Sequence, residues 1–258
     1  MRQPIATPLK ALILIGMALF LYSRLANGSL YFYINQRFMG FTLFTVIGLI
    51  VVGLSYRMAR RPASAEGHPN GEDLDAHPVH SHSHGLGWGA VALILIPIVL
   101  GLAVPPQPLG ASALANREIN AGLNESTMPG IVGAAAPKAT TDKNILDWWK
   151  SFRAGADLNA DPAIVGQPAR VVGFVYQDGR HGDDHFMVVR YVVSCCVADA
   201  SALGLVVAVP NAASFENDQW VEVEGVFTPG ALDGWKMPVL TAQAITPVDA
   251  PTQPYLYP

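Results

Sequence analysis

Residues 186–200 read FMVVRYVVSCCVADA and contain both cysteines of the chain, Cys195 and Cys196. Val, Tyr, Met and Phe fit a pleated, buried surface, so this run predicts a buried β-strand from Phe186 to Val193. Gly and Asp residues on either side of the run supply turns. The two thiols are therefore expected at the end of a strand.

Potential metal ligands gather around this strand. Thiolates and imidazoles are good ligands for zinc or copper, and four are available here: Cys195, Cys196, His181 and His185. Neighbouring strand residues point to opposite faces, so both cysteines can bind one ion only if the strand breaks at the pair. Two alternatives stay open: a redox-active dithiol, or structural cysteines beside histidines on an exposed hairpin.

Two charged residues of the same stretch have open roles. Asp199 is expected either to accept backbone N–H groups in a turn or to support a thiol ligand from outside. Arg190 lies inside the apolar strand. It needs a counter-charge if it is buried, and otherwise it marks a solvent-exposed face.

The composition points to a membrane protein. Hydrophobic residues make up 51% of the 258 residues and charged residues only 14%, with a mean hydropathy of +0.30. Such an excess is expected to be concentrated in membrane spans. The net charge of -4 gives no basic surface for phosphate binding, so nucleic acid is not expected as a partner.

Three hydrophobic segments predict transmembrane helices: Thr7–Leu25, Phe38–Tyr56 and Leu86–Val104. The first is bounded by Lys10 and Arg24, whose long side chains can reach the membrane interface. A cleaved signal peptide is the alternative for this first segment. Pro97 is expected to kink the third, which neighbouring helices can accommodate.

Basic residues set the predicted orientation. Loops rich in Lys and Arg tend to stay cytoplasmic. The N-terminus and the second loop carry Arg2, Lys10, Arg57, Arg60 and Arg61, whereas the first loop has only Arg24 and Arg37. The chain is therefore predicted to be a multi-pass protein of the cytoplasmic membrane, with the N-terminus inside and everything after the third span outside.

The second loop, residues 59–85 within the membrane region 1–104, is rich in Pro, Gly, Ser and His. Its composition predicts a solvated loop without regular structure. Alternating histidines can also capture a transition metal weakly. The candidates are His77, His80, His82 and His84.

The remainder of the chain predicts a linker and a small all-β domain. Residues 105–140 read as a flexible linker, with a short helix around Ser112–Leu123, and residues 141–258 as an outer domain that opens with a helix at 141–153. Five strands suit an OB-fold-like barrel, with a β-sandwich as the alternative. The predicted strands are Arg170–Tyr176, Phe186–Val193, Leu203–Val209, Gln219–Phe227 and Met237–Ala244.

The predicted helix and barrel have further expected features. The helix has Ile145, Trp148, Trp149 and Phe152 on one face, expected to pack on the barrel rather than on a membrane or partner. From Pro162 onward the chain has 4 basic and 10 acidic residues, unlike a barrel built for oligonucleotides. The common catalytic motifs of hydrolases, nucleotide-binding proteins and zinc proteases are missing, so we do not expect an enzyme.

The second half resembles the YcgQ-like family of bacterial membrane proteins. The resemblance is carried by Gly173-Phe174-Val175-Tyr176, by Arg190 with the Cys-Cys-Val-Ala-Asp-Ala run at 195–200, by the strand at 220–225, and by Pro254-Tyr255-Leu256-Tyr257. Members of this family are described as one subunit of a two-component permease. The resemblance therefore implies a partner with many transmembrane helices.

Two functions follow as hypotheses. The first is a non-catalytic accessory subunit that works through a permease. The second is a membrane-tethered metal-binding or thiol-redox protein that acts alone, with zinc or copper as its metal.

Overall fold

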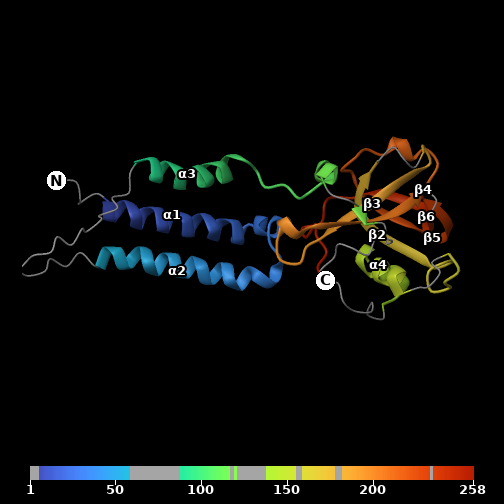
Figure 1. Cartoon of the computed structure of the whole chain (residues 1–258), viewed down its shortest axis with the longest axis horizontal. Helices are drawn as coiled ribbons and strands as arrows, with labels where there is room; N and C mark the ends of the chain where they lie inside the picture. The colour runs from blue at the N-terminus through green and yellow to red at the C-terminus, as the bar shows by residue number, and fades with distance from the viewer. Residues whose placement is uncertain are drawn as a thin grey trace, which may run out of the picture. The chain divides into compact units, whose positions relative to one another are not determined.

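The computed structural model describes residues 6–58, 88–116, 119–120, 138–154, 159–177, 182–232 and 235–258. The chain divides into two compact units (Figure 1). The helical unit comprises Met1–Ser29 and Arg37–Pro106, and the barrel unit comprises Leu30–Gln36 and Gln107–Pro258. A short segment between two helices therefore belongs to the barrel unit.

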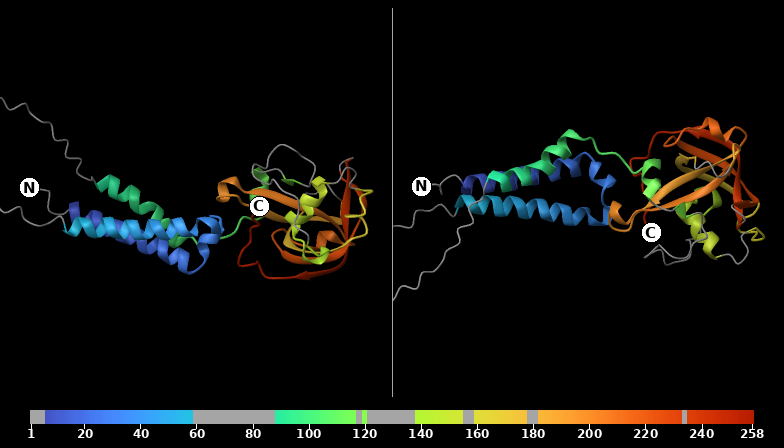
Figure 2. Two further views of the ribbon diagram at one scale, coloured as in Figure 1. Left: turned by 90° about the horizontal axis from the view of Figure 1, so that it is seen from below. Right: turned by 45° about the horizontal axis from the view of Figure 1, so that its top comes forward.

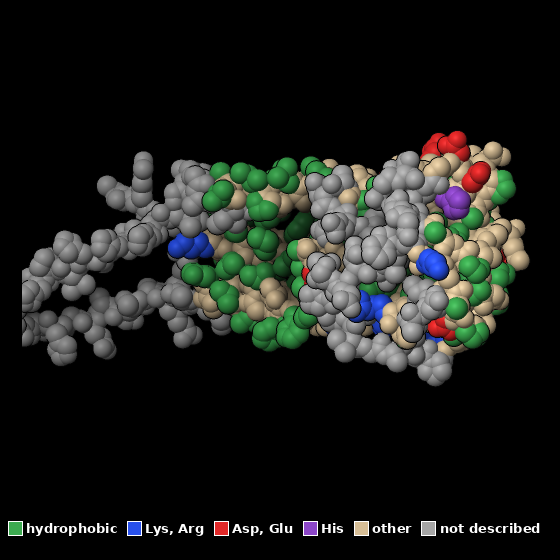
Figure 3. Space-filling view, turned by 45° about the vertical axis from the view of Figure 1, so that its right-hand side comes forward, with side chains coloured by type: hydrophobic (Ala, Val, Ile, Leu, Met, Phe, Trp, Pro, Cys, Tyr) green, Lys and Arg blue, Asp and Glu red, His purple; other side chains and the backbone are tan. Residues whose placement is uncertain are grey.

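The helical unit contains α1 (Ala6–Ala26), α2 (Met39–Met58) and α3 (Trp88–Ala103). Two glycines allow close packing inside it. A Cβ on Gly53 of α2 would lie 3.0 Å from Ile15 of α1, and one on Gly101 of α3 would lie 2.7 Å from the ring of Phe20. Hydrophobic side chains cover the outside of these helices (Figure 3).

Two helices in the described part of the chain are long and apolar enough to cross a membrane, Pro8–Ala26 and Gln36–Tyr56. Only 11% of each span is buried, so these helices do not form the core of a water-soluble fold, and they suggest membrane association. The described α3 has 16 residues and falls short of this length. The prediction of three spans is therefore not confirmed, because the structure gives two candidates rather than three.

The barrel unit closes five strands into a β-barrel, compatible with an OB-like fold (Figure 2). The order is β4-β3-β2-β5-β6, and a parallel pairing of β6 with β4 closes the barrel; a two-residue strand, β1 (Ile119–Asn120), adds to the outer side of β4. The barrel strands are β2 (Pro168–Tyr176), β3 (His185–Val192), β4 (Ser201–Ala208), β5 (Trp220–Leu232) and β6 (Trp235–Pro247).

All five predicted barrel strands are confirmed, with ends that differ by a few residues. In β5, Val221 and Val223 are buried while Glu224 is exposed, as alternation predicts. Two glycines are needed for closure. A Cβ on Gly173 would lie 2.7 Å from the Val189 carbonyl oxygen, and one on Gly225, beside a bulge, would collide with the backbone of β6.

The predicted helix is α4 (Ile145–Ala154). It begins later than expected, because Asn144 rather than Thr141 or Asp142 caps it. Asn144 Oδ1 accepts the Asp147 N–H at 3.0 Å, and the Asp147 carboxylate accepts the Asn144 N–H at 3.1 Å. The predicted apolar face is buried against the barrel. The packing role is confirmed.

Strand β3 is buried on both faces. Phe186, Val188 and Val192 face the core shared with α4. Val189 and Tyr191 face a second core. This second core includes the C-terminal tail and two 3₁₀ turns, η3 (Ala111–Asn116) and η5 (Val197–Asp199). Burial of both faces explains why β3 reads as a nearly continuous apolar run.

Candidate functional site

The strand breaks at the cysteine pair. Strand β3 ends at Val192, and the chain then turns into η5. Both cysteines are free, Cys195 is exposed, and the two Sγ atoms lie 3.6 Å apart. The side chains therefore do not alternate as they would along a strand, and both thiols can reach one ion or one reagent.

Asp199 holds this turn. Its carboxylate accepts the N–H groups of Ser194 at 2.9 Å, Cys195 at 2.7 Å and Cys196 at 3.5 Å. Partial burial raises the pKa of Asp199, but the hydrogen bonds from the Cys195 thiol and these N–H groups outweigh it, so the pKa is lowered overall. The Asp199 carboxylate therefore accepts backbone N–H groups in a turn, which is one of the two roles expected for it.

The Asp199 carboxylate also acts on one thiol. Its hydrogen bond from the Cys195 thiol, followed by the contact with Cys196, raises the pKa of Cys195 to about 11. A thiol with such a pKa is protonated at neutral pH. Cys195 is therefore not a preformed thiolate.

The segment between α1 and α2 pairs with the cysteine turn. Ile34 and Cys196 form an antiparallel bridge. The Asn35 N–H donates to the Cys195 carbonyl, and the Val197 N–H donates to the Tyr33 carbonyl, both at 2.9 Å. The side chain of Asn35, which is only 2% exposed, donates to the Ser194 carbonyl at 2.9 Å and the Val193 carbonyl at 3.4 Å. The segment thus docks at the cysteine turn through backbone and side-chain bonds.

Arg190 fixes the C-terminal tail beside this turn. It is 8% exposed and donates to the carbonyls of Gln253 and Pro254, both at 2.8 Å, with the Trp220 ring 5.4 Å from its guanidinium carbon. Burial lowers the pKa of Arg190 to about 10. Across the described residues, backbone carbonyls rather than a carboxylate satisfy this buried cation, an arrangement that the sequence did not indicate.

The tail connects several segments of the barrel unit. Leu256 bridges Val192, its N–H donating to the Tyr191 carbonyl at 2.8 Å. The hydroxyl of Tyr255 donates to the Phe32 carbonyl at 3.2 Å and accepts the Leu109 N–H at 3.0 Å. The tail, the start of the predicted linker and the α1–α2 segment thus meet around the end of β3.

The structure does not bring His185 and the cysteines together. His185 begins β3 and pairs with Ala208, whereas the thiols follow the other end of that strand. His181 and the histidines at 77, 80, 82 and 84 lie outside the described residues. Within the described ranges, no group of three or more His, Cys, Asp or Glu side chains is placed to hold a metal ion. Of the predicted metal ligands that the structure describes, only the two adjacent thiols lie together.

A shallow depression of about 360 Å³ lies elsewhere on the barrel, between β2, β5 and β6. Arg170, Glu224 and Gln243 are its charged or amide-bearing lining residues. It is separate from the cysteine turn and brings no thiol or histidine to its walls.

Asn35 and Tyr255 were missed as site residues by sequence reasoning. Asn35 lies about 160 residues before its partners in the chain, and a single sequence contains no signal that pairs them. Tyr255 falls within the terminal run, residues 254–257, that carries part of the family resemblance. That resemblance was the signal by which the tail could have been identified as part of the site.

Comparison with protein families gives two matches. The DUF1980 N-terminal domain matches residues 9–120, and the DUF1980 C-terminal domain matches residues 157–258. No curated protein matches the chain. The first match covers the three helices and the segment of residues 30–36 between α1 and α2, and the second covers the five-stranded barrel. The chain thus carries both domains of the DUF1980 family, which supports its YcgQ-like resemblance.

Proposed function

We propose that this chain is a non-catalytic accessory subunit of a membrane permease, with its barrel on the outer side of the cytoplasmic membrane. The three apolar segments contain no acidic residue or histidine. Ion and proton routes usually need such groups facing the interior of a helical bundle. A pore for solute is therefore expected from a partner with more helices.

One observation carries the topology: the segment that joins the two candidate spans is part of the barrel unit. Its hydrogen bonds to the cysteine turn require the α1–α2 connection and the barrel to lie on the same side of the membrane. If α2 crosses, the chain must cross back before the barrel begins. The segment available for this return is α3.

The dimensions of α3 are compatible with this role. Its 16 residues span about 24 Å, and the predicted segment Leu86–Val104 spans about 28 Å, against a hydrocarbon core of about 30 Å. Gly101 near the C-terminal end of α3 packs on Phe20 near the C-terminal end of α1, so the two helices run in the same direction. Parallel α1 and α3 with an intervening α2 fit three crossings.

The basic residues support an outward barrel. Residues 30–36 are flanked in the sequence by Arg24 and Arg37. The opposite ends of α1 and α2 carry Lys10 and Arg57. Including Arg2, Arg60 and Arg61, the cytoplasmic excess follows the positive-inside rule.

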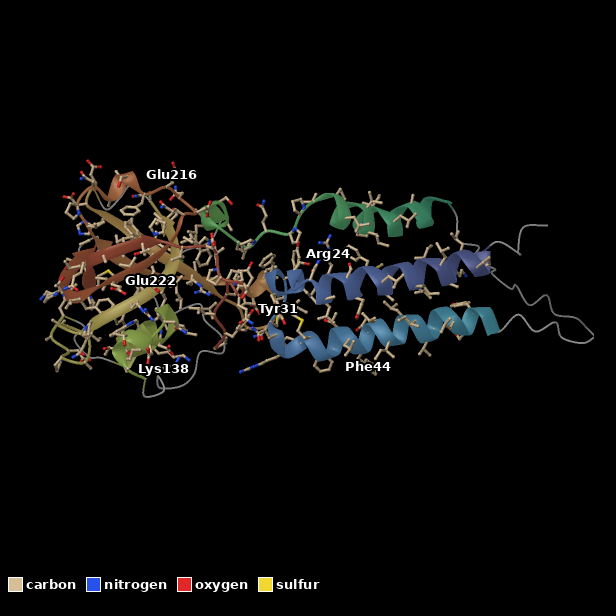
Figure 4. All side chains as sticks on the ribbon, turned by 180° about the vertical axis from the view of Figure 1, so that it is seen from behind. Arg24, Tyr31, Phe44, Lys138, Glu216 and Glu222 are labelled. Atoms are coloured by element: carbon tan, nitrogen blue, oxygen red, sulfur yellow. The ribbon has the colours of Figure 1, made fainter. Side chains whose placement is uncertain are left out.

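A face of α2 is available for a permease helix. Added Cβ atoms on Gly40 and Gly48 would meet nothing within 4 Å, whereas Gly53 is already used against α1. Phe44, 75% exposed, lies between these two glycines and projects from α2 (Figure 4). Small residues let a partner backbone approach closely in a membrane.

Co-purification tests the proposed function. The tagged chain would be co-expressed with a candidate multi-helix permease from the same organism, and both would be extracted in mild detergent. We expect elution at a fixed ratio, loss of the permease in Gly48→Leu, and retention in the control Gly16→Leu on α1, whose added side chain also enters open space. Separate elution of the two unmodified proteins would reject the complex.

Cell growth provides a second readout of the same proposal. Zinc and copper tolerance would be compared in strains lacking this chain, the permease, or both. A shared complex predicts that the double deletion matches the stronger single deletion, whereas independent, additive effects argue against it.

The second candidate function is a membrane-tethered metal-binding or thiol-redox protein that acts alone. The 3.6 Å separation of the two free thiols favours it, since two thiolates bound to one zinc at about 2.3 Å would be separated by a similar distance. Elemental analysis of the purified full chain, with Cys195→Ser/Cys196→Ser as control, tests the metal version. Equal metal content in the unmodified chain and the double variant would show that the cysteines are not metal ligands.

A further inference from the structure

The peptide bond between the two cysteines has a structural role of its own. Its carbonyl, from Cys195, accepts the Asn35 N–H at 2.9 Å. Its N–H, from Cys196, points to the Asp199 carboxylate at 3.5 Å. Ile34 pairs with Cys196 directly. Part of the docking of residues 30–36 therefore depends on the orientation of this peptide.

The same peptide would lie inside the ring formed by a disulfide between neighbours. The Cα atoms of adjacent residues are about 3.8 Å apart across a trans peptide, less than the roughly 4.4–6.8 Å usual for disulfides. The enclosed peptide must therefore distort when the ring closes. The two Sγ atoms at 3.6 Å need to approach each other by about 1.5 Å to reach bonding distance.

We propose that Cys195 and Cys196 form a reversible thiol–disulfide pair, and that its oxidation releases the 30–36 segment from the cysteine turn. The pair is suited to exchange because Cys195 is exposed and both thiols are free. The released contacts are the Asn35-to-Cys195 and Val197-to-Tyr33 hydrogen bonds. This inference does not depend on a permease partner.

The oxidant is a disulfide, either a small one such as oxidised glutathione or a disulfide-bearing oxidoreductase. One of the two thiols, as a thiolate, attacks the oxidant disulfide, forms a mixed disulfide and expels one thiolate; the neighbouring Sγ lies 3.6 Å away for the second step. We write the steps with Cys196 as the first nucleophile, and the reverse order gives the same product. Cys195 then loses its proton, attacks the Cys196 sulfur and expels the second thiolate. Two protein thiols lose two electrons and two protons, and the oxidant disulfide becomes two thiols.

Intact mass tests the two exchange steps. Reduced full-length protein in detergent would be treated with oxidised glutathione and measured by intact mass. We expect the unmodified chain to lose about 2 Da, and Cys195→Ser to gain about 305 Da as a trapped mixed disulfide. Cys196→Ser should be trapped in the same way, because it also retains a single thiol.

Release of the segment is measured by hydrogen exchange of the same samples. We expect exchange at Asn35 and Val197 to rise at least roughly tenfold on oxidation of the unmodified chain. The reduced chain with Asn35→Ala should show a similar rise at Val197 without oxidant, and this variant calibrates the readout. The double variant Cys195→Ser/Cys196→Ser should not respond to oxidant.

Two results would overturn the proposal. One is the absence of the 2 Da loss, including formation of disulfide-linked dimers instead. The other is a complete 2 Da loss with unchanged exchange at both amides, because the disulfide would then form without moving the segment. Neither result depends on whether the chain co-purifies with a permease, so the two proposals fail separately.

Discussion

The two ends of β3 carry residues that the sequence grouped into one metal site, and they differ in what surrounds them. At the first end, His185 pairs with Ala208 of the neighbouring strand, and the Asp184 carbonyl accepts the Val209 N–H. At the other end, the cysteine turn meets segments from distant parts of the chain, represented by Asn35 and Leu256. Strand β3 runs from His185 to Val192, and its length of roughly 23 Å separates His185 from the turn that carries Cys195. Closeness in sequence across a strand is therefore not closeness in space.

The two ends also differ in what stabilises them. Ordinary strand pairing holds the His185 end. The cysteine end relies on side chains that satisfy backbone groups: Arg190 and Asn35 donate to carbonyls, and Asp199 accepts N–H groups. Substitutions at the cysteine end should therefore have larger effects than matched ones at the histidine end or on the open barrel surface.

Loss of Arg190 should have the largest effect. Arg190→Ala removes a buried cation and leaves the Gln253 and Pro254 carbonyls without their donor, so we expect unfolding free energy to fall by about 3 kcal/mol. The matched control is Arg170→Ala, whose side chain is 52% exposed in a long contact with Glu222 and should cost under about 0.5 kcal/mol. Urea unfolding of the full chain in mild detergent, followed by tryptophan fluorescence, measures both. Equal losses would show that the tail does not depend on Arg190.

Asp199 should control thiol reactivity at the cysteine end. Asp199→Asn removes the charge that raises the Cys195 pKa to about 11, so the pKa should fall and the thiolate fraction at pH 8 should rise. A return towards the ordinary value would increase alkylation by iodoacetamide up to about 100-fold. Mass spectrometry of the alkylated peptide gives the rate. Asp184→Asn, at the other end of β3, is the control and should leave the rate unchanged; an unchanged rate in Asp199→Asn would show that the carboxylate does not govern Cys195.

Much of the fold could be predicted from the sequence, because its signals are local. Alternation marks Val221 and Val223 as inward-facing, the apolar run marks β3, and Gly225 marks the bulge. The start of α4 was misplaced because Asn144, Asp142 and Thr141 are all acceptable caps in sequence. Only the hydrogen bond that the Asp147 N–H donates to Asn144 Oδ1 distinguishes them.

The candidate site was predictable only in part. The cysteine pair and Asp199 are adjacent in sequence, so their turn could be anticipated. Asn35, however, approaches from a connection between two predicted spans, and neither periodicity nor composition encodes that long-range pairing. The sequence indicates that a buried Arg190 needs a partner. Its partners are backbone carbonyls of the tail, and every residue type has such a carbonyl, so the sequence cannot identify them.

Domain boundaries drawn from hydropathy have a practical consequence. A fragment beginning at Gln107 contains all five barrel strands but lacks Leu30–Gln36. The Cys195 carbonyl and the Val197 N–H would lose their partners in that fragment. Thiol and metal measurements on an isolated barrel would therefore describe an altered turn, and the full chain is the appropriate sample.

Loss of Asn35 should have an intermediate effect. Asn35→Ala removes two side-chain hydrogen bonds at a site that is only 2% exposed, and we expect a loss of about 1–3 kcal/mol in local stability. Hydrogen exchange at Val197 in the reduced protein measures this opening. Tyr33→Ala is the control, because Tyr33 is 45% exposed and its contribution is a backbone carbonyl that alanine keeps. Similar exchange in the two variants would place the docking energy in the backbone pairing rather than in the Asn35 side chain.

The smallest effect is expected at the other end of β3. His185 is only partly buried, and its strand pairing uses backbone groups that a substitution retains, so His185→Gln should change stability by less than about 0.5 kcal/mol. Since the length of β3, roughly 23 Å, lies between His185 and the turn that carries the thiols, the variant should also keep the metal content and the glutathione reactivity of the unmodified chain. Elemental analysis and intact mass on one full-length preparation test both expectations, with Cys195→Ser/Cys196→Ser as the positive control for loss. A fall in metal content in His185→Gln that matches the fall in the double cysteine variant would mean that the two ends of β3 do meet at a shared ion, for example across two copies of the chain, and the contrast between them would no longer hold.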